Sequence, residues 1–205
     1  MVQDRISSFK MKPILPQQNI FFFFFLYSFS FGAFFPRIGD LQIQMDVGEG
    51  VLGLALVGLP LGVQFALLFS DKILLFLGFK FAMCLGVPTF GVSLILASLS
   101  LEPIGFFFAL VIGGIAVGIV EVAINLEADR VEYKIGKKIM NRSHSFWSLG
   151  FFSAALLGAL FAQIEISPVT HFIGSFLVGS LLVLFLSFRY EVAAIRPNSN
   201  HKTAI

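Results

Sequence analysis

The sequence predicts an all-α integral membrane protein built as a bundle of six transmembrane helices, and three observations carry this prediction. Hydrophobic residues make up 57% of the 205 residues and charged residues only 13%, whereas a soluble domain is about half apolar and about a quarter charged. Six apolar segments follow one another along the chain, and the basic residues gather in alternate connections between them. So large an apolar excess leaves too little polar surface to face water, which indicates that the solvent is lipid.

The six apolar segments each match the thickness of a bilayer. A helix needs about 20 mostly apolar residues to cross the hydrocarbon core. Segments of this kind are predicted at residues 18–37, 50–70, 76–98, 103–125, 144–164 and 168–188. Together they form one transmembrane domain, 18–188, between an N-terminal tail, 1–17, and a C-terminal tail, 189–205.

The first apolar segment follows Lys10 and Lys12, in the basic-then-apolar order of a signal peptide. The sequence Phe-Phe-Pro-Arg comes after it in place of a small-residue cleavage site. Several further apolar segments follow. We therefore expect the first segment to be retained as a transmembrane helix.

The basic residues predict the orientation of the bundle. One set of connections and both tails hold thirteen of the fourteen lysines and arginines, and the alternate connections hold only Arg37. The thirteen are Arg5, Lys10, Lys12, Lys72, Lys80, Arg130, Lys134, Lys137, Lys138, Arg142, Arg189, Arg196 and Lys202. By the positive-inside rule they face the cytoplasm, so both termini are predicted to be cytoplasmic.

Two pairs of glycines recur at the spacing of one helical turn. Gly58 and Gly62 belong to the second predicted span, and Gly114 and Gly118 belong to the fourth. Small residues four apart let helices approach closely in lipid. We interpret these pairs as packing sites rather than as conformational hinges.

Glu121 is the main charge within the apolar segments, and Asn125 lies four residues later on the same helix face. A carboxylate inside the bilayer is costly unless it faces a partner or a wet cavity, so it is a functional candidate by default. The pair could bind a proton and a polar substrate. Alternatively, Glu121 lies at the membrane interface and only caps the bundle.

The polar stretch 126–143 mixes acidic and basic residues. It is predicted either as a solvated loop with surface salt bridges or as a gate that latches neighbouring helices. His144 and Ser148 follow one helical turn apart, which suggests a serine hydrolase, but nucleophilic catalysis also needs an oxyanion site and a group that orients the histidine. We therefore do not expect an enzyme.

The sequence predicts no cofactor, no metal site and no nucleic-acid partner. The single cysteine, Cys84, lies in an apolar segment, so neither an internal disulfide nor a Cys-rich metal site is expected. No phosphate-binding loop or nucleotide fingerprint is found. A formal net charge of +2 is too small to indicate nucleic-acid binding.

The segment from Glu121 to Gly150 resembles a known family. Glu-Val-Ala-Ile-Asn, Asp-Arg-Val-Glu and Lys-Lys-Ile-Met-Asn-Arg-Ser-His-Ser-Phe-Trp-Ser-Leu-Gly follow one another there. They are similar to the fourth span, loop and fifth span of one branch of the major facilitator superfamily. This branch includes the fucose-permease-like sugar/proton symporters and related bacterial inner-membrane transporters. Phe35-Pro36-Arg37 and Gly50 to Leu56 also match, and the resemblance covers about residues 20 to 190.

The resemblance implies a secondary transporter, or its N-terminal half, that moves a small polar solute by alternating access with proton coupling. It implies a bacterial inner-membrane location. Glu121 matches the acid of the fourth span, Asn125 is its polar neighbour, and Arg37 is an outer-end contact. A cytoplasmic gate is expected from a set of charged and polar residues. These are Lys80, Arg130, Glu132, Arg142 and His144.

The sequence departs from the family pattern at two places. Anchored on Gly78, the Asp-Arg pair of the family's loop between spans two and three falls at Leu75 and Phe76. Aligned on Pro36, the acid of the first span falls at Gly32. Only half of the proton-coupling pair is therefore present, so sugar/proton symport does not carry over to this chain as it stands.

The family's proteins have twelve spans in two halves, each built from 3+3 inverted repeats. The expected partners are therefore the lipid bilayer, a solute, a proton and a second six-helix half. The second half is expected from a separate chain or from a parallel homodimer. The alternative expectation is a truncated, non-transporting membrane subunit or an inactive gene fragment.

Overall fold

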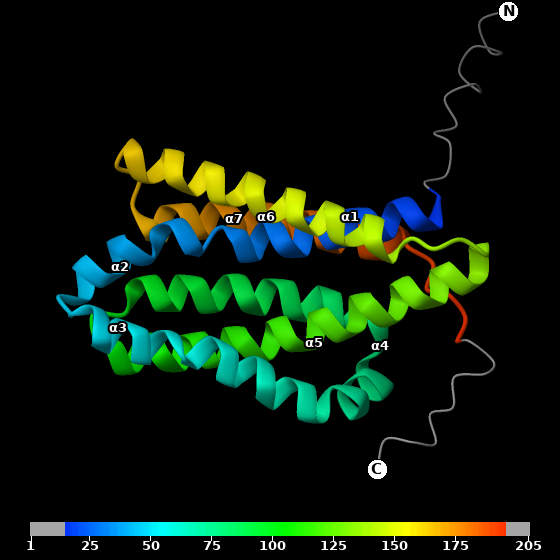
Figure 1. Ribbon diagram of the computed structural model, residues 1–205, viewed down its shortest axis with the longest axis horizontal. Coiled ribbons are helices and arrows are strands. Elements are labelled where there is room, and N and C mark those ends of the chain that lie inside the picture. Colours follow the sequence, from blue (N-terminus) through cyan, green and yellow to red (C-terminus); the bar gives the residue numbers. More distant parts are fainter. Residues whose placement is uncertain (1–14, 196–205) are drawn as a thin grey trace, which may run out of the picture.

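The computed structural model describes residues 15–195, and all regular structure among them is helical. Its elements are α1 (Pro16–Gly32), the 3₁₀ turn η2 (Phe35–Arg37), α2 (Ile38–Met45), α3 (Glu49–Leu56), α4 (Gly58–Leu99), α5 (Pro103–Ile135), α6 (Met140–Gln163) and α7 (Pro168–Arg189). The long helices lie side by side along one axis (Figure 1).

Local sequence signals set several helix ends. Pro16, Pro103 and Pro168 each occupy the first turn of a long helix, where the missing N–H of proline costs no hydrogen bond. Ser167 caps α7 by accepting a hydrogen bond from the backbone N–H of Thr170 at 3.2 Å. Gly136 ends α5 in the left-handed conformation, at φ 65°, which glycine adopts without steric cost.

Five helices in the described part are long and apolar enough to cross a membrane. They are Pro16–Met45, Glu49–Leu99, Pro103–Ile135, Met140–Gln163 and Pro168–Arg189. The chain is therefore a multi-pass helical membrane protein. The predicted segments 50–70 and 76–98 belong to one of the five, in which α3 and α4 follow each other.

Helix α4 reverses its direction at Gly78. This residue has φ 70° and ψ 171°, a conformation that is essentially confined to glycine. Before it, Gly58 faces Phe107 of α5 and Ala66 faces Gly118, so this arm runs parallel to α5. After it, Gly86 faces Val120 and then Ser93 faces Gly113. The second arm therefore runs antiparallel to α5, and Figure 1 shows the two arms meeting at one end of the bundle.

Replacing Gly78 with alanine is expected to destabilise the bundle, because a Cβ makes its backbone conformation unfavourable. The expected loss is about 1–3 kcal/mol, the usual cost of such strain. No neighbouring atom lies within 4 Å of a Cβ built at this position, so the whole effect would come from the backbone. Thermal unfolding in detergent would measure it. Gly53→Ala is the control, since Gly53 is also in open space and has an ordinary helical conformation. Equal stability of the two variants would contradict the assignment of strain.

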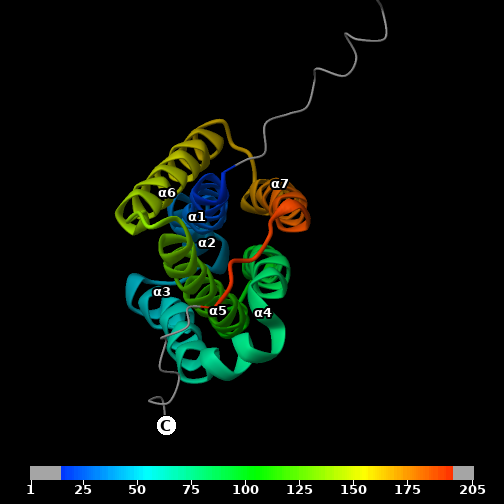
Figure 2. The ribbon, with the colours of Figure 1, turned by 90° about the vertical axis from the view of Figure 1, so that its right-hand side faces the viewer.

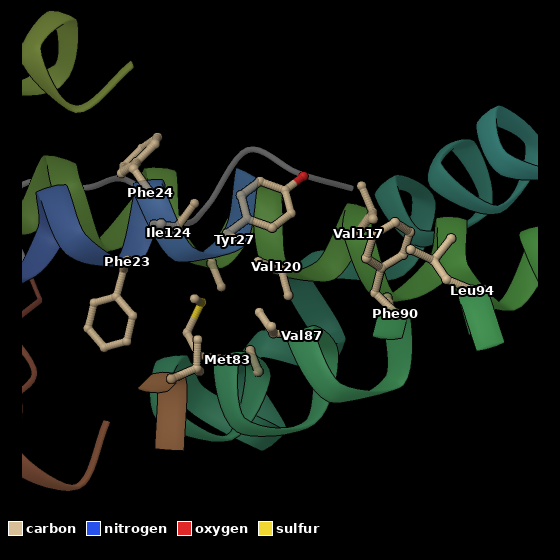
Figure 3. Packing of buried hydrophobic residues seen from close by; sticks show 14 of the residues in the cluster. Phe23, Phe24, Tyr27, Met83, Val87, Phe90, Leu94, Val117, Val120 and Ile124 are labelled. Carbon is tan, nitrogen blue, oxygen red and sulfur yellow. The ribbon is translucent and has the colours of Figure 1, made fainter. Parts of the chain in front are cut away.

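The core lies where α1, α4 and α5 meet. Phe23, Phe24 and Tyr27 of α1 are buried together with Met83, Val87 and Phe90 of α4 and with Val120 and Ile124 of α5 (Figure 3). Viewed along the bundle, α1 lies between α6 and α7 on one side and α5 on the other (Figure 2). This position gives α1 neighbours on most of its circumference.

Residues 126–135 and 140–143 are helical, so the expected loop 126–143 is wrong outside residues 136–139. Helix α5 runs on to Ile135. The reason is visible in its apolar side chains: Ile124, Ala128 and Val131 are all buried, at the spacing of one helix face. Only residues 136–139 connect α5 to α6.

Candidate functional site

Glu121 lies in a small polar cluster between α5 and α1. The side-chain amide of Asn125 donates to the Glu121 carboxylate oxygen Oε1 at 3.1 Å and to its backbone carbonyl at 2.8 Å. The side chain of Tyr27, on α1, lies beside the Glu121 carboxylate and interacts with it electrostatically. Tyr27 is buried, whereas Glu121 and Asn125 are partly exposed. Figure 3 shows Tyr27 among the buried residues of α1, α4 and α5.

An aromatic group continues from this polar cluster along α1 and α6. Phe31 lies one turn beyond Tyr27 on α1. Its ring centroid is 6.4 Å from that of Trp147 and 6.1 Å from that of Phe151, both on α6. Trp147 and Phe151 stack with their centroids 5.4 Å apart and their planes at 15°. Phe31, Trp147 and Phe151 are each partly exposed.

This arrangement can bind a polar solute or a proton. A carboxylate at membrane depth accepts hydrogen bonds from hydroxyl or amine groups, and it can also take up a proton. The amide of Asn125 orients it through a hydrogen bond, and the side chain of Tyr27 lies beside it. Within residues 15–195, no three metal-ligating side chains gather closely enough to hold a metal ion.

Tyr27 is the member of this cluster that the sequence analysis missed. It lies in a run of phenylalanines, where the sequence predicts only that an aromatic side chain faces the lipid or belongs to the core. Its hydroxyl is the one available signal, since a buried phenol usually finds a hydrogen-bond partner.

Arg37 lies apart from Glu121, at the opposite end of the bundle from the other described basic residues. Its side chain is only 2% exposed; Nε donates to Asp40 at 2.6 Å, and Nη2 donates to the Ile166 carbonyl at 2.6 Å. Ten residues separate it from Tyr27, about 15 Å along a helix. It thus ties η2 to the connection between α6 and α7.

The residues expected to form a gate lie in three separate places. Lys80 and Arg130 line one groove of about 540 Å³, together with the turn at Gly78 and the extended segment 192–195. Glu132 accepts hydrogen bonds from the backbone N–H groups of Ile139 and Met140, at 2.5 and 2.7 Å, and so connects α5 to the start of α6.

Arg142 and His144 lie where α6 meets α1. The guanidinium of Arg142 is 5.7 Å from the ring centroid of Phe21, and the His144 ring is 5.2 Å from that of Phe24. The hydroxyl of Ser148 donates to the backbone carbonyl of His144 at 3.1 Å. The Ser–His spacing therefore gives no hydrogen bond between the hydroxyl and the imidazole.

Glu127 forms a buried latch that the sequence analysis placed only among loop charges. Its side chain is 0% exposed. Oε1 accepts from the Tyr190 hydroxyl at 2.8 Å and from the Ala193 backbone N–H at 2.6 Å, and Oε2 pairs with Arg130 at 3.2 Å. Burial and the Glu127 carboxylate raise the pKa of Tyr190 far above its usual value. The phenol therefore stays protonated and remains a hydrogen-bond donor at neutral pH.

The latch fixes the chain beyond α7 against α5. Residues 190–195, which follow α7 in an extended conformation, pass across the end of α5 at this point. Because α5 remains helical to Ile135, Glu127 and Arg130 lie one turn apart and can pair. Recognising that the helix continues past residue 125 would have revealed the pair.

Comparison with known proteins points to transporters. The chain is 24% identical over 161 residues to an uncharacterized MFS-type transporter of Yersinia pestis, covering 78% of this chain and 42% of that protein. It is 27% identical over 182 residues to an uncharacterized transporter of Sinorhizobium fredii, covering 87% of this chain and 48% of that protein. The similarity supports a transporter role. The chain spans about half the length of these relatives.

No protein-family model matches the chain, and no solved structure matches it. Of the two relatives, the Yersinia pestis protein is named as an MFS-type transporter and the Sinorhizobium fredii protein as a transporter. This similarity agrees with the helical membrane bundle, and it supports a transporter rather than an enzyme.

Proposed function

We propose that this bundle is one half of a secondary transporter of the major facilitator type, which moves a small polar solute by alternating access. The contact of Glu121 with Asn125 and Tyr27 carries this proposal, because it places an oriented carboxylate between two helices of a membrane bundle. The relatives named as transporters support the class of function. The aromatic faces of Phe31, Trp147 and Phe151 suit the apolar face of a sugar-like solute.

Six crossings are part of this proposal. The reversal at Gly78 divides α4 into two antiparallel arms, and each arm holds about 20 residues, enough to cross a bilayer. Eight described basic residues lie at one end of the bundle. They are Lys72, Lys80, Arg130, Lys134, Lys137, Lys138, Arg142 and Arg189. The positive-inside rule then assigns this end to the cytoplasm of a bacterial inner membrane.

A second six-helix bundle completes the proposed transporter. The relatives are about twice as long as the matched region, and transporters built from two such bundles bind solute between them. Glu121, Asn125 and the partly exposed rings would form this bundle's wall of the pathway. The second wall would come from a further bundle, either on another chain or from a second copy of this one.

Glu121→Gln is expected to abolish proton-coupled solute movement, because the amide keeps the side chain's shape but cannot take up a proton. Proteoliposomes with an internal pH-sensitive dye would be challenged with a panel of monosaccharides and small organic anions. In the unaltered protein, at least one solute should change the internal pH. Glu165→Gln, which changes an exposed acid in the connection between α6 and α7, is the control and should behave as the unaltered protein.

Two results would count against the proposal. Unchanged transport in Glu121→Gln would remove Glu121 from the mechanism. No response to any solute, from protein that is folded and reconstituted, would exclude a pair of identical copies as the complete transporter and would favour the alternative of a membrane subunit that does not transport by itself.

A further inference from the structure

A groove between α1, α6 and α7 has a polar mouth and an apolar interior. The mouth, of about 510 Å³, is lined by Gln17, Gln18 and Arg142 with three phenylalanines. A second cavity, of about 460 Å³, is lined only by apolar side chains from the three helices. Phe22 and Phe146 line both, so the two cavities adjoin and form one groove.

The apolar interior of the groove is open to the surroundings of the bundle. Leu149 of α6 and Leu182 and Phe185 of α7 line it, and these side chains are 52%, 45% and 58% exposed. In Figure 2, α6 and α7 lie on either side of α1. For a protein in lipid, such a groove can hold an acyl chain while the contacts between the three helices stay unchanged.

Two arginines flank the groove at the same end of the bundle. The guanidinium of Arg142 lies 5.7 Å from the ring centroid of Phe21, and that of Arg189 lies 5.2 Å from the ring centroid of Phe185. Arg142 opens α6 and Arg189 closes α7, so the antiparallel helices bring both to one level. The residues that line the two cavities include no acid.

The dimensions of the groove match the arrangement of a phospholipid. Leu149 lies seven residues from Arg142 on α6, and Leu182 lies seven residues from Arg189 on α7. Each interval is about 10 Å along a helix. The groove therefore extends about 10 Å from a cationic, amide-lined mouth into apolar surroundings.

We propose that this groove binds an anionic phospholipid of the surrounding bilayer. The phosphate lies between Arg142 and Arg189, with the amides of Gln17 and Gln18 beside it, and one acyl chain runs along Phe22, Phe146 and Leu182. Basic pockets between helices at the cytoplasmic surface are suited to anionic headgroups, because each cation adds electrostatic attraction near the membrane. The site lies on the far side of α1 from Glu121 and does not depend on transport.

Quenching of a single tryptophan by brominated lipids tests the proposal. Trp147 is the only tryptophan of the chain, so Trp147→Phe combined with Leu182→Trp places the one reporter in the groove. The variant would be reconstituted with mixtures of brominated phosphatidylglycerol and brominated phosphatidylcholine. We expect phosphatidylglycerol to be preferred about 30-fold, as two cations near the surface would produce.

Substitutions in the same background identify the cause of the preference. Arg142→Gln with Arg189→Gln should bring the preference to about one, whereas Arg142→Lys with Arg189→Lys should largely retain it. Lys72→Gln removes an exposed basic residue elsewhere at the same end and should leave the preference unchanged. Equal quenching by the two lipids in the starting protein would overturn the proposal. So would an unchanged preference in the double Gln variant, or an equal loss in Lys72→Gln.

Discussion

Replacing Gly114 with leucine is expected to force α4 away from α5 and to destabilise the bundle. A Cβ built at Gly114 would lie 2.9 Å from the Cα of Gly62, and a Cβ at Gly62 would lie equally close to the Cα of Gly114. The atoms in the way are backbone, so no rotamer change can relieve the clash. We expect a loss of about 3 kcal/mol, at the upper end of the usual cost of overpacking.

The measurement is thermal unfolding in detergent, followed by the fluorescence of Trp147 and by size-exclusion chromatography. A loss of about 3 kcal/mol corresponds to a fall of about 10 °C in Tm for a protein of this size. Gly174→Leu on α7 is the matched control, because no atom lies within 4 Å of a Cβ built there. An unchanged Tm in Gly114→Leu would show that the two backbones are not in contact.

Replacing Glu127 with alanine is expected to release the extended segment 190–195 and to destabilise the bundle. The substitution leaves the Tyr190 hydroxyl and the Ala193 N–H without their acceptor, and it leaves Arg130 without its partner. Removing one partner of a buried ion pair costs about 3–5 kcal/mol. Increased trypsin cleavage after Arg189 would report the release of the segment.

Two further variants divide the contribution of Glu127 among its partners. In Glu127→Gln, the remaining carbonyl oxygen can keep both hydrogen bonds on Oε1, so only the pair with Arg130 is lost. Tyr190→Phe removes one hydrogen bond and should cost about 1 kcal/mol. We expect both to be clearly more stable than Glu127→Ala, and equal losses in all three would contradict the proposed latch.

The candidate site was only partly predictable from the sequence. Glu121 and Asn125 are four residues apart on one helix, so their contact follows from the geometry of α5 alone. Tyr27 and Glu121 are far apart in the chain, and only the packing of α1 against α5 brings them together. The contacts of Arg37, with Asp40 and with the Ile166 carbonyl, likewise depend on how η2 packs against the connection between α6 and α7.

The contacts of the residues expected to form a gate were not predictable from the charge pattern. Lys80, Arg130, Glu132, Arg142 and His144 all belong to the same end of the molecule, as their order in the sequence implies. Their contacts differ, however. Lys80 and Arg130 line a groove, and Glu132 binds the backbone at the start of α6. Arg142 and His144 each lie against a phenylalanine ring of α1. The charge of a side chain predicts its preferred depth in the membrane, but it does not identify the residue that the side chain contacts.

The sequence by itself determined that this protein is a helical membrane bundle, because hydrophobicity and length are summed along the chain and need no knowledge of neighbours. It also marked the close-packing glycines and the intramembrane acid. Only the tertiary structure decided that α4 turns back at Gly78, that Tyr27 meets Glu121 and that Glu127 holds the segment beyond α7. These features depend on backbone conformation and on contacts between residues distant in the chain, which the composition of a segment does not encode.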